Sequence, residues 1–214
     1  FTYDLQNRLD TATTVRADDG ETVLTTTTYF YDGEGNKVRT VAAVSVNGGP
    51  ATTSATDYVV ATTNLTGLPQ VLEERDGTTR AVKTTYVVGN DLIAQVGSTA
   101  SSLRFFLYDG HGSTRQLTNA QGVTTDRFAY TAFGKPVGFD PNTAATKYLY
   151  TGQQFDPLSG KYYLRARLYD PAVGRFTQTD PFPGLPGDAQ VLHKYVYAVN
   201  NPANVSDPSG LYPN

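Results

Sequence analysis

Aspartates followed by proline are the residues of this sequence best placed to do chemistry. The chain of 214 residues contains no Cys, which excludes disulfides, thiolate metal sites and cysteine nucleophiles. Its two histidines, His111 and His193, stand apart without the spacing of metal ligands. Two carboxylates held close together can act as general base and general acid, because both cannot ionise at once. Asp-Pro pairs begin at Asp140, Asp156, Asp170, Asp180 and Asp207.

The same dipeptide also has a purely structural use. An Asp side chain can accept a hydrogen bond from its own backbone two residues on, and proline fixes φ for the next turn position. Residues alone therefore favour a turn at every Asp-Pro pair, and Asp156 and Asp170 are interpreted in this way.

The elements that would position these residues are indicated by an internal repeat. Tyr-Asp dipeptides recur at Tyr3, Tyr31, Tyr108 and Tyr169, with weaker copies between them, at intervals of roughly 20 to 28 residues over most of the chain. A unit of that length suits one hairpin with two strands and two turns. We expect Tyr3, Tyr31, Tyr108 and Tyr130 to occupy similar places, at strand ends before similar turns.

The best copies show the turn chemistry directly. After Tyr31 and Tyr108, an Asp and two glycines stand where a tight turn needs side-chain acceptors and positive φ. The flanking segments predict strands, at 25–31, 38–46, 103–107, 115–117 and 123–130. The paired glycines do not indicate a phosphate site, since that fingerprint must lead from a strand into a helix.

Composition agrees with an all-β, antiparallel fold. The chain has 15 Tyr and 10 Phe with abundant Thr, residue types that favour pleated sheets, and frequent Gly and Pro that separate short strands. A net charge of -3 without a basic stripe argues against nucleic acid as a partner. No apolar run approaches the roughly 20 residues needed to span a bilayer.

The pattern changes after about Gly138, so we predict two parts: a strip of repeat hairpins at 1–137 and a terminal segment at 138–214. In the second part, 139–147 is expected to be a loop, and 148–153 and 162–169 are dense strand candidates. At most one short helix is expected, over 189–200, with Asp188 as its N-cap.

The stretch from Tyr148 to Leu211 resembles the terminal core of Rhs and YD-repeat proteins. The resemblance is carried by ordered pieces of sequence: YTGQ from Tyr150, DPLSG from Asp156, YYLRARLYDP from Tyr162, GRF from Gly174, NNP from Asn200 and DPSGL from Asp207. In that family a β-sheet winds spirally into a hollow shell, and the terminal core plugs one end.

The resemblance also implies an activity. In the toxins of the family, the core cleaves its own chain just beyond the last motif by chemistry similar to that of aspartic proteases. Carried over by position, the essential residues are Arg167, Asp180 and Asp207, and the bond cut is Leu211–Tyr212. No cofactor and no metal are implied.

The length of the chain limits what it could enclose by itself. A sheet of this many residues closed into a sphere would leave a lumen for on the order of 45 residues, given usual strand and sheet spacings and native packing density. We therefore expect the partners to be upstream repeats of the same protein and an enclosed C-terminal toxin domain, or other copies joined by their strand edges. Phe1 is not expected to be a natural translation start.

A second function remains open at this point. A structural or adhesive surface protein built of YD repeats, without a toxin, fits the same repeats and the small lumen. Either protein would be secreted or carried on a bacterial cell surface.

Overall fold

The computed structural model describes residues 1–18, 20–181 and 193–213. The chain divides into two compact units, Phe1–Leu103 and Arg104–Asn214. The predicted division after residue 137 rests on a change of sequence pattern and not on compactness. It therefore stays a prediction.

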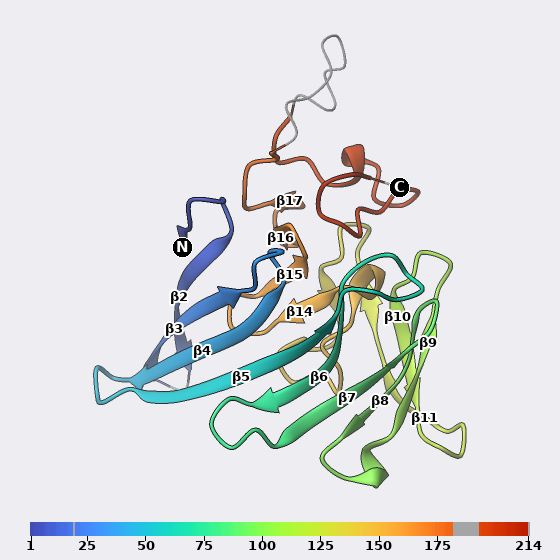
Figure 1. The fold of residues 1–214 in the computed structure, drawn as a ribbon, viewed down its shortest axis with the longest axis horizontal. Helices are drawn as coiled ribbons and strands as arrows, with labels where there is room; N and C mark the ends of the chain where they lie inside the picture. Colours follow the sequence, from blue (N-terminus) through green and yellow to red (C-terminus); the bar gives the residue numbers. More distant parts are fainter. Residues whose placement is uncertain (19, 182–192, 214) are drawn as a thin grey trace. The chain divides into compact units, whose positions relative to one another are not determined.

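The first unit is an antiparallel sheet whose strands follow one another in chain order, each paired with the next (Figure 1). Its strands are β1 (Thr2–Tyr3), β2 (Leu9–Asp18), β3 (Glu21–Tyr31), β4 (Lys37–Val46), β5 (Thr52–Ala61), β6 (Gln70–Asp76), β7 (Val82–Val88) and β8 (Leu92–Gly97), and a 3-10 turn, η1, follows at Ala100–Ser102. This meander is the form that successive hairpins must take, so the predicted all-β antiparallel fold is confirmed.

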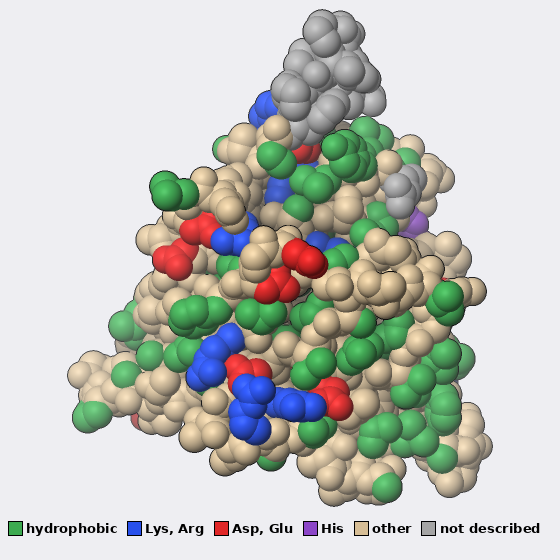
Figure 2. Space-filling view, in the orientation of Figure 1, with side chains coloured by type: hydrophobic (Ala, Val, Ile, Leu, Met, Phe, Trp, Pro, Cys, Tyr) green, Lys and Arg blue, Asp and Glu red, His purple; other side chains and the backbone are tan. Residues whose placement is uncertain are grey.

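Ion pairs cross the middle strands of the first unit. Asp57 on β5 lies 3.2 Å from the guanidinium of Arg39 on β4 and also pairs with Arg80, while Lys83 lies 3.1 Å from Asp76. Figure 2 shows basic and acidic side chains side by side over β5 and β6. Asp57 is buried while its arginine partners are largely exposed, and opposite charges on neighbouring strands favour this pairing.

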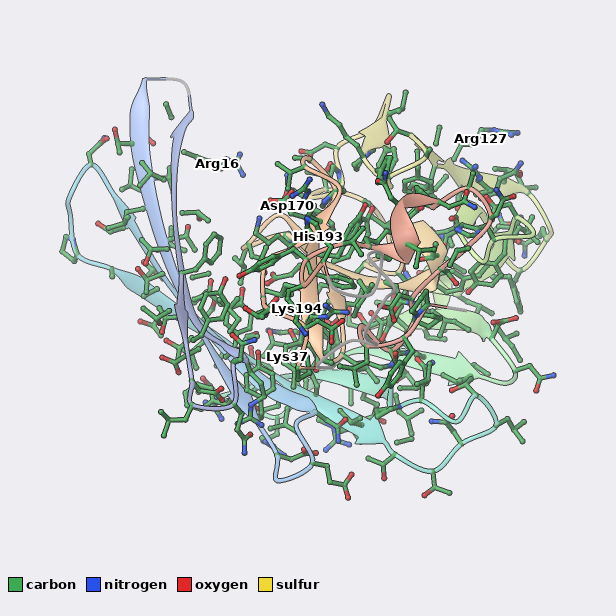
Figure 3. All side chains as sticks on the ribbon, turned by 90° about the horizontal axis from the view of Figure 1, so that it is seen from above. Arg16, Lys37, Arg127, Asp170, His193 and Lys194 are labelled. Atoms are coloured by element: carbon green, nitrogen blue, oxygen red, sulfur yellow. The ribbon has the colours of Figure 1, made fainter. Side chains whose placement is uncertain are left out.

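The second unit contains three small antiparallel groups of strands. They are β9 (Arg104–Tyr108), β10 (Thr114–Thr118) and β11 (Thr124–Arg127); β12 (Ala129–Tyr130) and β13 (Pro136–Val137); and β14 (Gln154–Asp156), β15 (Lys161–Leu164), β16 (Arg167–Asp170) and β17 (Arg175–Phe176). Side chains of β11 alternate between half-buried and exposed, and Arg127 at its end points away from the unit (Figure 3).

The repeat turns share one geometry. Three turns begin with Asp4, Asp32 and Asp109. In each, Oδ1 of the Asp accepts hydrogen bonds of 2.8 to 3.0 Å from the backbone N–H groups two and four residues later. The residue three positions after each Asp has positive φ: 62° at Asn7, 89° at Gly35 and 78° at Gly112. The turn after Tyr130 keeps the backbone pattern with Thr131 in place of Asp. The predicted equivalence of Tyr3, Tyr31, Tyr108 and Tyr130 is therefore confirmed.

Consecutive repeats contact each other through a cation over a tyrosine ring. A basic residue that follows one turn lies over the next tyrosine of the repeat, 4.7 Å away for Arg8 over Tyr31, 5.0 Å for Lys37 over Tyr58 and 5.5 Å for Arg115 over Tyr130. Each contact adds a cation–π attraction between neighbouring repeats.

Three predicted elements differ from the structure. The strand expected at 123–130 is interrupted by buried Phe128, which separates β11 from β12. The segment 148–153 is not a strand, because it turns back on itself and forms a 3-10 turn, η2 (Tyr150–Gly152), with Thr151 at a φ of 47°. The segment 162–169 is a hairpin, since Arg165 at a φ of 58° reverses the chain and pairs Tyr162 with Tyr169.

The helix expected at 189–200 lies partly outside the described residues, which resume at His193. From there to Asn200 the chain forms turns and a short 3-10 element, η3 (Ala198–Asn200). Val199 at a φ of 45° breaks the helical path within it. The loop expected at 139–147 is confirmed.

The core of the second unit is a stack of tyrosines. Tyr162 and Tyr169 are completely buried, and their rings lie 6.4 Å apart. Three buried tyrosine hydroxyls donate to three consecutive carbonyls: Tyr150 to Ala132 at 2.6 Å, Tyr169 to Phe133 at 2.7 Å and Tyr162 to Gly134 at 3.2 Å. Burial raises the pKa of Tyr162 and Tyr169, so these hydroxyls stay protonated donors.

Candidate functional site

A tight hairpin provides the floor of the candidate site. Arg167 opens β16 directly after the turn at Arg165, and its side chain is only 3% exposed. The ring of Phe176 covers the guanidinium at 3.7 Å. The guanidinium is thus held against an aromatic ring, and its N–H groups are directed at Asp180, Asp207 and the carbonyl of Gly210.

The terminal motif packs against this hairpin through its backbone. The N–H of Ala166 donates to the carbonyl of Ser209 at 3.2 Å. The carbonyls of Pro208 and Gly210 accept from the side chains of Arg165 and Arg167. The segment that leads to Leu211 is therefore fixed on both sides of the hairpin turn.

Only glycine fits at position 210. Its φ is 70°, and a Cβ there would stand 2.2 Å from the carbonyl oxygen of Leu164. The close approach lets the terminal segment lie directly on the hairpin, which brings Asp207 to Arg167.

Arg167 joins the two predicted aspartates. Its Nη1 lies 3.0 Å from Oδ2 of Asp180, and its Nη2 lies 3.5 Å from Oδ2 of Asp207. Asp180 follows β17 and is held by its own N–H, which donates to the carbonyl of Lys194 at 2.9 Å. The structure thus brings together Arg167, Asp180 and Asp207, 40 residues apart at the extremes.

The two carboxyl groups have different surroundings. The Asp207 side chain is 2% exposed, whereas that of Asp180 is 19% exposed. Burial raises the pKa of Asp207, even though Arg167 and the hydrogen bonds from Ser209 and Leu211 oppose that rise. Burial likewise lowers the pKa of Arg167, while its two aspartates counteract this. Burial therefore favours the protonated form of Asp207.

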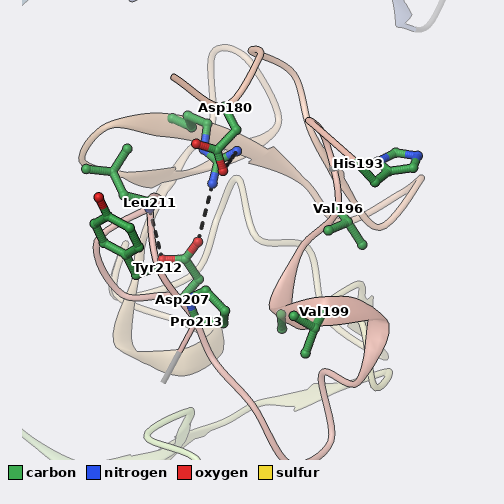
Figure 4. Close-up of a pocket in the computed structure, with 10 residues that line it drawn as sticks. Asp180, His193, Val196, Val199, Asp207, Leu211, Tyr212 and Pro213 are labelled. Atoms are coloured by element: carbon green, nitrogen blue, oxygen red, sulfur yellow. Dashed lines mark hydrogen bonds and ion pairs between the residues drawn. The ribbon is translucent and has the colours of Figure 1, made fainter. Parts of the chain in front are cut away.

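Both residues of the predicted cleavage site line the same pocket. The pocket is about 70 Å³ in volume and is lined by Arg167, Asp180, His193, Val196, Ala198, Val199, Asp207, Leu211, Tyr212 and Pro213. Figure 4 shows Asp180 and Asp207 on either side of the Arg167 guanidinium, each joined to it by an ion pair. A water molecule needs about 10 to 15 Å³, so the pocket can hold one beside the carboxyl groups.

The remaining Asp-Pro pairs build turns, as predicted. Asp156 and Asp170 each accept the N–H two residues later, at 3.0 and 2.9 Å, and a glycine with positive φ closes each turn. Neither lines the pocket of Asp180 and Asp207. Asp156 is buried as Asp207 is, so the proximity of both site aspartates to Arg167 is what separates the two classes.

The sequence reasoning missed Ser209. Its hydroxyl lies 3.1 Å from Oδ1 of Asp207 and 3.1 Å from the backbone nitrogens of Leu211 and Tyr212. A serine two residues after Asp207 and three before Tyr212 has the spacing of a local hydroxyl-to-amide contact, so the sequence did hold a signal. His193 lines the pocket but is exposed, with Nε2 3.5 Å from Arg175.

Within the described residues, no group of three metal-binding side chains is present. In the same part of the chain, no helix is long and apolar enough to cross a membrane.

Comparison with known proteins gives a consistent picture. No protein-family model matches the chain. It is 31% identical over 213 residues to the tRNA3(Ser)-specific nuclease WapA of Bacillus spizizenii, a match that covers 98% of this chain and 8% of that protein. It is 30% identical over 226 residues to the double-stranded DNA deaminase toxin A of Burkholderia cenocepacia, covering 99% of this chain and 15% of the toxin.

Among solved structures, TcdB2-TccC3 matches with a TM-score of 0.69 and 20% identity, over 98% of this chain and 10% of that one. At that identity the likeness shows a shared fold. The chain spans less than a sixth of the length of these proteins. Over nearly its whole length it is similar to one segment of much larger, toxin-related proteins.

Proposed function

We propose that this chain is the C-terminal part of an Rhs/YD-repeat shell that encloses a toxin, and that it frees the toxin by cutting its own backbone after Leu211. The observation that carries the proposal is the pairing of Arg167 with both Asp180 and Asp207 in a pocket that Leu211 and Tyr212 also line. The similarity to larger toxin-related proteins supports the enclosing role.

The environments of the two carboxyl groups assign their roles. Asp180, closer to Arg167 and partly exposed, acts as the ionised base that removes a proton from water. Asp207, whose pKa burial raises, keeps its proton and serves as the acid. Arg167 keeps the pair from repelling each other and orients both groups.

The partners follow from this function. Upstream repeats would complete the shell, a C-terminal toxin domain would lie inside it, and the protein would act outside the cell that makes it, secreted or on the surface. The reaction occurs once in each molecule and needs no cofactor.

The test uses this chain with a small reporter domain fused after Asn214. Intact mass should reveal two fragments, the second beginning at Tyr212, and the rate should not change with protein concentration. Asp180→Asn and Asp207→Asn should each abolish the cut, because the swap keeps shape and removes acid–base function. Asp156→Asn and Asp170→Asn are matched controls, since they alter turn aspartates that also precede proline.

Two outcomes would count against the proposal. Full cutting in the Asp180→Asn/Asp207→Asn double variant would end it, and so would an intact parent chain that remains uncut under all conditions of pH. Full cutting by the double variant would place the reaction on other residues, whereas an uncut parent would leave the structural or adhesive surface protein as the function.

A further inference from the structure

Ser209 is the side chain that connects the acid of the site to the nitrogen of the bond to be cut. Its Oγ lies 3.1 Å from Oδ1 of Asp207 and 3.1 Å from the backbone nitrogen of Tyr212. Tyr212 contributes the nitrogen of the Leu211–Tyr212 peptide bond. We propose that Ser209 passes a proton from Asp207 to this leaving nitrogen, an inference that rests on the proposed self-cutting.

The position of the proton on Asp207 supports the relay. Oδ2 of Asp207 faces the guanidinium of Arg167, which has donors and no acceptor. A proton on Oδ2 would therefore point at the N–H donors of a cation, which cannot accept it. On Oδ1 the proton lies beside the Ser209 hydroxyl, which donates to this oxygen in the structure, with the Leu211 N–H as a second donor. The hydroxyl can accept the proton once the Tyr212 N–H no longer occupies one of its two lone pairs.

A serine hydroxyl can carry out both halves of the transfer. It has one proton to donate and two lone pairs to accept with. In the intact chain the N–H groups of Leu211 and Tyr212 donate to Oγ. Once water has added to the Leu211 carbonyl carbon, the Tyr212 nitrogen becomes pyramidal and has a lone pair directed at a donor.

The atoms balance over the whole step. Water oxygen bonds to the Leu211 carbonyl carbon, and Asp180 takes one water proton. The carbon–nitrogen bond then breaks, and its electron pair goes to the Tyr212 nitrogen. That nitrogen takes the Ser209 proton, which Asp207 replaces. The products are a Leu211 carboxyl group and a Tyr212 amine, with Asp180 protonated and Asp207 ionised.

Ser209 is well fixed for this role. Its carbonyl accepts the N–H of Ala166 at 3.2 Å, and the following Gly210 lies directly against Leu164. The same contacts could serve a turn alone, so the test needs a matched serine. Ser159 provides one, because its Oγ donates to Oδ2 of Asp156 at 2.9 Å in a turn that also begins with Asp-Pro.

The experiment measures the cutting rate of the reporter fusion against pH. Ser209→Ala should cut about 100-fold more slowly or worse, the usual contribution of a general acid. Ser209→Thr should recover most of the rate, because it restores a hydroxyl. Ser159→Ala should cut at the parent rate. The decline of rate at high pH that Asp207 imposes on the parent should be lost in Ser209→Ala.

Each result decides between the two claims. If Asp207→Asn abolishes cutting while Ser209→Ala cuts at the parent rate, the relay is wrong and the proposed function stands. If the parent does not cut, or Asp207→Asn cuts normally, both fail. Should Ser209→Ala unfold, Ser209→Cys keeps the size with a weak donor and should also be slow; parent-like cutting by it would overturn the relay.

Discussion

Nη2 of Arg167 lies 3.5 Å from Oδ2 of Asp207, and the two side chains are only 3% and 2% exposed. A guanidinium and a carboxyl group taken so far out of water depend on each other, since removing either takes from the other a buried polar contact that water cannot replace. The same guanidinium reaches Asp180 at 3.0 Å, so one arginine sets the electrostatics of the whole site.

Arg167→Ala should therefore lower both stability and cutting. We expect a loss of about 3 to 5 kcal/mol in the free energy of unfolding, the usual cost of breaking a buried pair, and slower cutting of the reporter fusion. Arg175→Ala is the control: this exposed arginine should change stability by no more than about 0.5 kcal/mol. Equal denaturant midpoints for the two variants would contradict the account.

Cutting should slow as pH rises. Asp207 must hold a proton to act as the acid, and burial raises its pKa above the ordinary value of 3.8. The protonated fraction of Asp207 falls as pH rises through that raised pKa, and the rate falls with it on this side of the profile, while Asp180 must stay ionised to act as the base. The measurement is the single-turnover rate of the fusion across pH. A rate that climbs steadily toward alkaline pH would rule out Asp207 as the acid.

Asp207 should also weaken the fold as pH rises. Its pKa is higher in the folded chain than in the unfolded one, so the folded state binds more protons between the two values. Its contribution to the free energy of unfolding is most favourable below about pH 4, the unfolded value, and declines as pH rises through the folded pKa. Denaturant unfolding of the parent and of Asp207→Asn should diverge over that window. Parallel pH profiles would show that this carboxyl is not perturbed.

Gly134→Ala should destabilise the second unit much more than Gly138→Ala. Both glycines have positive φ, 80° and 75°, so both variants share a backbone cost of about 1 to 2 kcal/mol. A Cβ at position 134 would also stand 2.5 Å from the ring of Tyr150, whereas nothing lies within 4 Å at position 138. Thermal unfolding should separate the two. Similar melting temperatures would mean that the Tyr150 ring can shift to admit the added methyl group at little cost.

The turn aspartates should make the chain sensitive to acid. Although burial opposes it, hydrogen bonds from Asn36 and from the amides of the turn lower the pKa of Asp32 below 3.8. Its stabilising contribution is complete above that value and is lost as pH falls through the lower, folded pKa. Asp32→Asn should thus lose less stability than the parent on acidification. Asp10→Asn, at an exposed position on β2, is the control and should follow the parent.

Local chemistry made much of this fold predictable. Asp32 and Asp109 specify their turns through hydrogen bonds to amides two and four residues away, and Gly35 and Gly112 accept the positive φ that follows. These are short-range effects, so the repeat and the meander of antiparallel strands could be predicted from the residues. The strands predicted at 123–130 and 148–153 were wrong because burial of Phe128 and of Thr151 set the local chain path there.

The candidate site, too, could be predicted from the sequence only in part. The sequence by itself determined which residues to consider, because the ordered motifs around Arg167, Asp180 and Asp207 mark them without any contact being known. Residue types alone could not separate Asp207 from Asp156, because both precede proline; the resemblance named Asp207 but gave no physical difference between the two positions.

Only the tertiary structure decided that difference. The hairpin turn at Arg165 and the absence of a side chain at Gly210 let the terminal segment lie on β16, which buries Asp207 against Arg167 and sets Ser209 between that carboxyl and the Tyr212 nitrogen. Burial and contacts between distant segments control pKa, and neither is contained in the order of residues around an aspartate.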